Sequence, residues 1–133
     1  MITYLLKIML YMSQIKLKVN NDWDPKLKSV LIDVSDWLGK YTKYYKIDFK
    51  DASNTVGYYN FEGIALTERM KHYSPLSLMT LLVHENRHAE NSISHTTCLT
   101  GDLPRLSGAC DDLFTRDYEH MGGYNLEVYF AAA

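Results

Sequence analysis

The segment from Ser74 to Asn91 places the strongest constraint on how this chain can fold. Ser74-Pro75 is a typical helix start, with a hydroxyl side chain to cap the helix and a proline at its first position. The residues that follow are apolar almost all the way round a helix: Leu76, Leu78, Met79, Leu81, Leu82 and Val83. Such a helix has to be covered on every side, so we expect it to be central and buried.

A chain of 133 residues is long enough to build one core around such a helix and too short for two comfortable domains. We therefore expect a single domain over residues 1–133. Apolar residues make up 47% of the chain, charged residues make up 23%, and the net charge is -2, as in ordinary soluble globular proteins. The densest basic stretch, residues 40–46, is short and typical of a solvated helix end. Without a larger basic block, we expect no nucleic-acid partner.

The residues around the central helix predict an α+β fold. Asp24-Pro25 is a second capped helix start, and apolar residues then recur at helical spacing. Short alternating stretches predict strands, and a last helix is expected to be interrupted near Gly122-Gly123. The expected elements are a helix over 25–44, extended segments over 46–50, 55–60 and 63–69, the central helix, and a helix over 111–133.

The apolar segment 2–12 is expected to form a core strand or a short helix. It is about a dozen residues long, which is too short for a bilayer span, and it carries a charge in its middle at Lys7. It also lacks the charged lead and small-residue cleavage site of a signal peptide. We therefore expect no transmembrane segment here.

The sequence His84-Glu85-Asn86-Arg87-His88 lies near the end of the central helix and matches the pattern HExxH. Residues four apart in a helix lie on the same face, so both imidazoles can bind one metal ion. We expect one zinc ion, which lowers the pKa of its bound water to about 7 and polarises a carbonyl group. Glu85, rotated by about 100 degrees from His84, would accept a proton from that water.

The motif also has a plain structural interpretation, in which His84 and His88 are hydrogen-bonded polar residues at the exposed end of a core helix. A chance match is uncommon, with odds of about one in a hundred at this composition. The predicted burial favours the metal site, because a helix covered on its other faces holds both histidines in place before the metal binds.

With this motif the sequence resembles the zincin metallopeptidases, in which a short edge strand precedes the HExxH helix. The matching run covers residues 63–88, about a fifth of the chain. The resemblance implies a zincin-like α+β fold: a small mixed sheet whose edge strand, 63–69, packs on the motif helix, with an N-terminal and a C-terminal helix. It also implies that His84 and His88 bind zinc, that Glu85 is the general base, and that an extended peptide or protein substrate pairs with the edge strand.

A catalytic zinc site needs a third protein ligand, and we favour His95. Within the zincins, the metzincin pattern is HExxHxxGxxH. Asn91 stands at its glycine position and tolerates a left-handed turn, while His95 lies one position later than the third histidine of that pattern. The alternative is a gluzincin-like site completed by Glu119 or Glu127, both on the expected last helix. His120 and His72 are weaker candidates, as surface histidines.

Cys98 and Cys110 leave the cellular compartment open. If they form a disulfide near the site, the protein is extracytoplasmic, because such bonds form in exported proteins. In a reducing cytoplasm they would be thiols. They could instead be zinc ligands of a closed structural site, although the compact CxxC spacing of such sites is absent. Asp111 and Asp112 are candidates to accept the outer N–H of a zinc-bound histidine, or they stabilise the first turn of a helix.

The run from Met121 to Tyr124 is similar to the methionine turn of metzincins. Tyr124 could donate a hydrogen bond to the oxyanion of a tetrahedral intermediate, although a structural role is commoner for one of eleven tyrosines. The two glycines of this run could instead allow close packing against the motif helix.

Three functions compete at this point. The leading one is a zinc-dependent hydrolase, a small metallopeptidase in which Glu85 activates a zinc-bound water. The second is a non-catalytic zincin-like domain in which zinc is structural or supports partner binding, motivated by the short length of the chain. The third is a helical interaction module with a coincidental motif.

Overall fold

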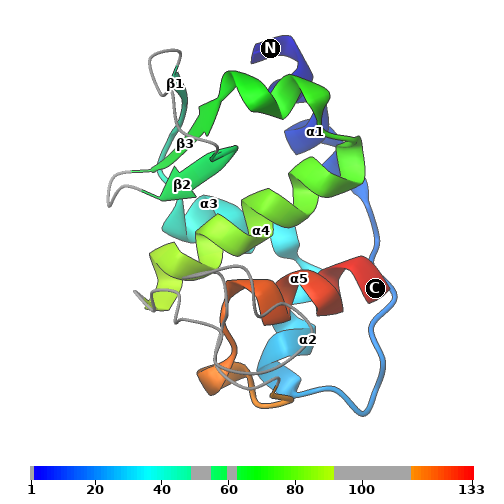
Figure 1. Cartoon of the computed structure of the whole chain (residues 1–133). Helices are drawn as coiled ribbons and strands as arrows, with labels where there is room; N and C mark the ends of the chain where they lie inside the picture. The colour runs from blue at the N-terminus through cyan, green and yellow to red at the C-terminus, as the bar shows by residue number, and fades with distance from the viewer. Residues whose placement is uncertain (1, 49–54, 60–62, 92–114) are drawn as a thin grey trace.

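The computed structural model describes residues 2–48, 55–59, 63–91 and 115–133, and Figure 1 shows their arrangement. Within them, five α-helices combine with a three-stranded mixed sheet, which confirms the α+β class. The helices are α1 (Ile2–Gln14), α2 (Pro25–Ile32), α3 (Val34–Tyr41), α4 (Pro75–Asn91) and α5 (Gly123–Ala132). The strands are β1 (Tyr45–Asp48), β2 (Gly57–Tyr59) and β3 (Ile64–Thr67), and two short 3-10 helices are η1 (Glu68–His72) and η2 (Tyr118–His120).

Helix α4 crosses the middle of the molecule, with the sheet on one side and α5 on another (Figure 1). It also packs against α1 and α3. Its start follows the expected pattern, because the Ser74 hydroxyl accepts a hydrogen bond from the N–H of Ser77 at 3.2 Å. Residues 82–87 are all buried, so the helix is covered on every side there, as expected, whereas its first turn is exposed and Leu76 is 52% exposed.

The sheet has the order β1-β3-β2, so β3 is its central strand. Strand β1 runs parallel to β3, and β2 runs antiparallel to it. The expectation that residues 63–69 form an edge strand is therefore wrong. All four residues of β3 are buried, as suits a strand that has neighbours on both sides and packs against α4. Gly63 permits the pairing with β1, because a Cβ there would lie 2.2 Å from the carbonyl oxygen of Tyr44.

Two expected helices are shorter in the structure. The predicted helix 25–44 is broken into α2 and α3 at Asp33, whose carboxylate accepts a hydrogen bond from the N–H of Asp36 at 3.3 Å and so caps α3. The predicted last helix begins only at Gly123, after an irregular segment that contains η2; residues 111–114 lie outside the described residues. Glu119 is therefore not on that helix.

The N-terminal segment is a helix, one of the two expected forms. Helix α1 buries Leu5, Ile8 and Met12 in the core at helical spacing. No helix in the described part of the chain is long and apolar enough to cross a membrane.

Asp24 joins the first part of the chain to the segment before α5. Its Oδ1 accepts hydrogen bonds from the N–H groups of Lys26 and Leu27, at 2.7 and 3.2 Å, and so caps α2. Its Oδ2 accepts the N–H of Tyr118 at 3.3 Å. Partial burial acts to raise the pKa of Asp24, but these three donors outweigh it and hold the pKa below its ordinary value.

Replacement of Asp24 tests this junction. Asp24→Ala is expected to lower the free energy of unfolding by about 1 kcal/mol at pH 7, since the helix cap and the contact to Tyr118 are both lost. Because the folded pKa is depressed, the charge of Asp24 stabilises the protein fully above the unfolded pKa of about 3.9, and this contribution is lost as the pH falls through the folded value.

Urea unfolding of the wild type and of Asp24→Asn between neutral and acid pH measures that contribution. The wild type should be the more stable at neutral pH, and the difference should shrink on acidification. A difference that stays constant with pH would show that the charge of Asp24 is not involved.

Candidate metal centre

The two histidines of the motif converge at one point. Nε2 of His84 lies 3.1 Å from Nε2 of His88, with the ring planes inclined at 72°. Two imidazoles bound to one tetrahedral zinc ion, with Zn–N distances of about 2.0–2.1 Å, have their nitrogens roughly 3.3 Å apart. The pair thus fits the expected metal with little adjustment, and the buried helix presents both rings from one rigid element.

The motif residues differ in their access to solvent. His84 is 3% exposed and Glu85 is 7% exposed, while His88, one turn further along, is only partly buried. Glu85 follows His84 directly and precedes His88 by three positions, so it borders the face that carries both rings. The site therefore runs from the interior of the molecule toward its surface.

Helix α5 surrounds the ring of His84 with three residues. A Cβ on Gly123 would lie 2.8 Å from Nδ1 of His84 and 2.9 Å from Cγ and Cε1, so only glycine fits against this ring. The ring of Tyr124 meets it at a centroid distance of 4.3 Å. Oε1 of Glu127 lies 2.8 Å from Nδ1 of the same ring.

Glu127 is thus next to the site, but at the side of the His84 ring away from the Nε2 pair. Carboxylates beside the outer nitrogen of a metal-binding histidine fix the orientation of its ring and raise its basicity. This position suits an orienting group better than the third ligand considered from the sequence. The expected close packing of the glycines against the motif helix is confirmed for Gly123.

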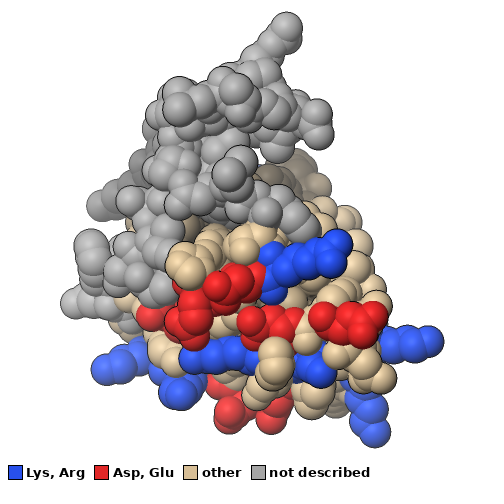
Figure 2. All heavy atoms as spheres, turned by 90° about the horizontal axis from the view of Figure 1, so that it is seen from below, with Lys and Arg blue, Asp and Glu red and all other residues tan. Residues whose placement is uncertain are grey.

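The other sequence candidates are dispersed. Glu119 is 73% exposed on the side chain and pairs with Lys26 at 3.8 Å, and His120, also exposed, lies 2.7 Å from Asp117. Acidic and basic side chains lie beside one another on the described part of the lower face of the molecule (Figure 2). His72 is exposed at the end of η1.

The favoured third ligand and both cysteines lie outside the described residues: His95, Cys98 and Cys110, together with Asp111 and Asp112. Among the residues that the structure describes, no group of three His, Cys, Asp or Glu side chains is arranged to hold a metal ion. The described part of the chain therefore brings two of the expected ligands together, His84 and His88, and the expected base Glu85 follows His84 on the same helix.

Asn86 anchors the motif on the side of α3. It is fully buried; its Oδ1 accepts a hydrogen bond from the hydroxyl of Thr42, and its Nδ2 donates to the carbonyl oxygen of Trp37 at 3.3 Å. Sequence reasoning passed over this residue as a variable position of the motif. A signal was present, because a polar residue in a helix predicted to be buried all round needs hydrogen-bond partners from elsewhere.

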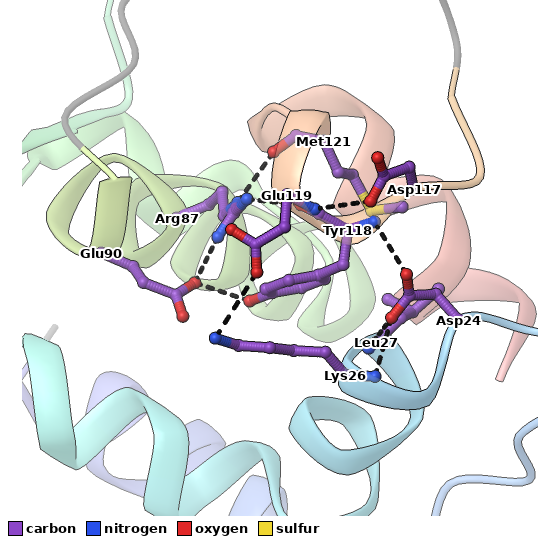
Figure 3. A network of polar contacts seen from close by, with 9 residues as sticks. All are labelled: Asp24, Lys26, Leu27, Arg87, Glu90, Asp117, Tyr118, Glu119 and Met121. Atoms are coloured by element: carbon purple, nitrogen blue, oxygen red, sulfur yellow. Dashed lines mark hydrogen bonds and ion pairs between the residues drawn. The ribbon is translucent and has the colours of Figure 1, made fainter.

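Arg87 anchors the motif to the segment before α5, in the network of Figure 3. Its Nε donates to the carbonyl oxygen of Met121 at 2.8 Å and its Nη2 to that of Tyr118 at 2.7 Å. Its Nη1 lies 2.5 Å from Oε2 of Glu90, which also accepts the Tyr118 hydroxyl at 2.6 Å. Burial and this hydrogen bond to Glu90 raise the pKa of Tyr118, so the phenol stays a neutral donor.

Comparisons with models of known protein families, with curated proteins and with solved structures find no match for this chain. No family follows from them. The resemblance to zincins rests on the HExxH spacing in a buried helix.

Gly123→Ala tests the packing of α5 on the motif. The added methyl group would overlap the ring of His84, so we expect the ring to be displaced and its nuclear magnetic resonance signals to shift in the metal-free protein. The matched control is Gly39→Ala, because a Cβ there meets nothing within 4 Å and should stabilise α3 by up to about 1 kcal/mol. Unchanged His84 signals in Gly123→Ala would contradict the close approach.

Proposed function

We propose that this protein is a zinc-dependent hydrolase in which His84 and His88 hold one zinc ion and Glu85 is the general base. The observation that carries the proposal is the 3.1 Å separation of the two Nε2 atoms, on a helix whose residues 82–87 are all buried. When bound, zinc would polarise a carbonyl group and lower the pKa of a coordinated water to about 7.

The carboxylate of Glu85 would take a proton from the attacking water and deliver it to the leaving group. Its position beside both histidines supports this role, as does its burial, since proton transfer within a water-poor site is protected from exchange with solvent. Glu127 would hold the ring of His84, with Nε2 directed to His88. His95 remains our proposed third ligand.

A peptide bond is the proposed substrate, by the resemblance of the motif. The place at which a peptide would pair has to differ from the sequence expectation, because β3 already has a strand on each side. Of the two outer strands of the described sheet, β2 packs directly against α4. We therefore propose that an extended peptide pairs along β2.

A second function is favoured by the same central position of β3. In the zincin arrangement the strand beside the motif helix receives the substrate, and here that strand is enclosed. A zinc ion that only stabilises the contact between α4 and α5, or supports the binding of a partner, needs no such strand. This non-catalytic domain would share the ligands His84 and His88 but not the role of Glu85.

Metal content and activity in three proteins test the proposal. The wild type is expected to bind one zinc ion per chain and to hydrolyse casein or a quenched fluorescent peptide library. His84→Ala should lose the metal and the activity, whereas Glu85→Gln should keep the metal and lose hydrolysis, by a factor of about 100 or more.

The same set separates the second function from the first. In a metal-stabilised domain, chelation would lower the melting temperature and Glu85→Gln would behave as the wild type in partner binding, without hydrolysis in either protein. A wild-type chain that binds no zinc after loading would exclude both.

A further inference from the structure

His84 and Arg87 lie three positions apart on α4 and face the same segment of the chain. His84 contacts the first turns of α5, through Gly123 and Glu127. Arg87 contacts the residues just before α5, through Tyr118 and Met121. One face of the motif helix therefore binds the C-terminal segment at two successive places.

The contact made by Arg87 is short and fixed. Its guanidinium group holds the carbonyl oxygens of Tyr118 and Met121 at 2.7 and 2.8 Å, and its side chain is only 4% exposed. Met121 is separated by one residue from Gly123, whose backbone lies against the ring of His84. A displacement at the Met121 carbonyl would therefore reach that ring with little chain in between to absorb it.

The segment is also held from its other side. The centroid of the Tyr118 ring lies 4.2 Å from the guanidinium carbon of Arg87. The backbone N–H of Tyr118 donates to Oδ2 of Asp24 at 3.3 Å (Figure 3). Glu90 offsets the buried charge of Arg87 and accepts the Tyr118 hydroxyl. A buried arginine whose donors are paired in this way defines one position for the residues it binds.

We propose that Arg87 is a positioning residue for His84: it fixes the Tyr118–Met121 segment, and through it the start of α5, so that Gly123 and Glu127 hold the imidazole with Nε2 toward His88. The part of this inference that concerns metal binding rests on the proposed function. The positioning of the ring itself does not, because it can be measured in the metal-free protein.

Arg87→Lys is the variant that tests the proposal. Lysine keeps a positive charge next to Glu90 but cannot donate to both carbonyl oxygens in the fixed geometry of a guanidinium group. Two controls accompany it. Glu119→Gln removes an exposed ion pair from the same segment, and Leu5→Ala weakens the core at α1, so that it reports the effect of lower stability alone.

Two quantities are measured in each protein: the histidine ring signals in the nuclear magnetic resonance spectrum without metal, and the dissociation constant for zinc by competition with a chelator. In Arg87→Lys we expect the His84 ring signals to shift and the zinc dissociation constant to rise about 10- to 100-fold, the range typical of lost outer contacts. In Glu119→Gln and Leu5→Ala both quantities should stay as in the wild type.

The outcomes separate this inference from the proposed function. If the wild type binds zinc and Arg87→Lys matches it in both quantities, or if Leu5→Ala reproduces the changes, Arg87 is not a positioning residue. If the wild type binds no zinc but the His84 signals shift in Arg87→Lys alone, the positioning stands and the proposed function fails. If Arg87→Lys does not fold, Tyr118→Phe takes its place, because it removes only the hydroxyl contact to Glu90. We expect this variant to shift the His84 ring signals to a smaller extent. Unchanged His84 signals would overturn the proposal.

Discussion

Burial of residues 84–87 removes four polar side chains from water in the middle of the molecule, on the helix that contacts α1, α3, α5 and the sheet. An unpaired buried polar group costs roughly 1–3 kcal/mol, so such a run persists only where other elements supply partners. The partners of these side chains come from different elements. The end of α3 supplies those of Asn86, the segment before α5 supplies those of Arg87, and α5 itself contacts His84. The hydrogen bonds of Asn86 and Arg87 thus tie α3 and the segment before α5 to α4.

In our proposal, the same contacts that stabilise the helix also prepare the two histidines for a metal ion. A histidine enclosed by Gly123, Tyr124 and Glu127 has little rotational freedom, and its Nε2 is directed to that of His88 before any metal binds. Preorganisation of this kind favours metal affinity, because no ordering of the ligands has to accompany binding. In our proposal, the residues between the two histidines of the motif are therefore part of the site, although they do not face the metal.

The features that sequence predicted well are those set by local signals. The start of α4 follows from Ser74-Pro75 and the apolar run after it, and the convergence of His84 and His88 follows from helical spacing. The feature that was wrong and the one that was missed both depend on partners far away in the chain. Strand β3 is central because β1 and β2 both pair with it, and Arg87, for which no partner was predicted, is paired with carbonyl groups 31 and 34 residues away. No local pattern contains that information. The break at Asp33 was within reach, since aspartate readily caps a new helix.

We propose that His84 and His88 form one metal site, and this can be tested by the anomalous scattering of crystals grown with zinc, measured across the zinc absorption edge. We expect one peak per chain, about 2.0–2.1 Å from Nε2 of both residues, with Glu127 at the outer nitrogen of His84. A peak elsewhere in the molecule with the two histidines unbound, or no peak at all, would contradict it.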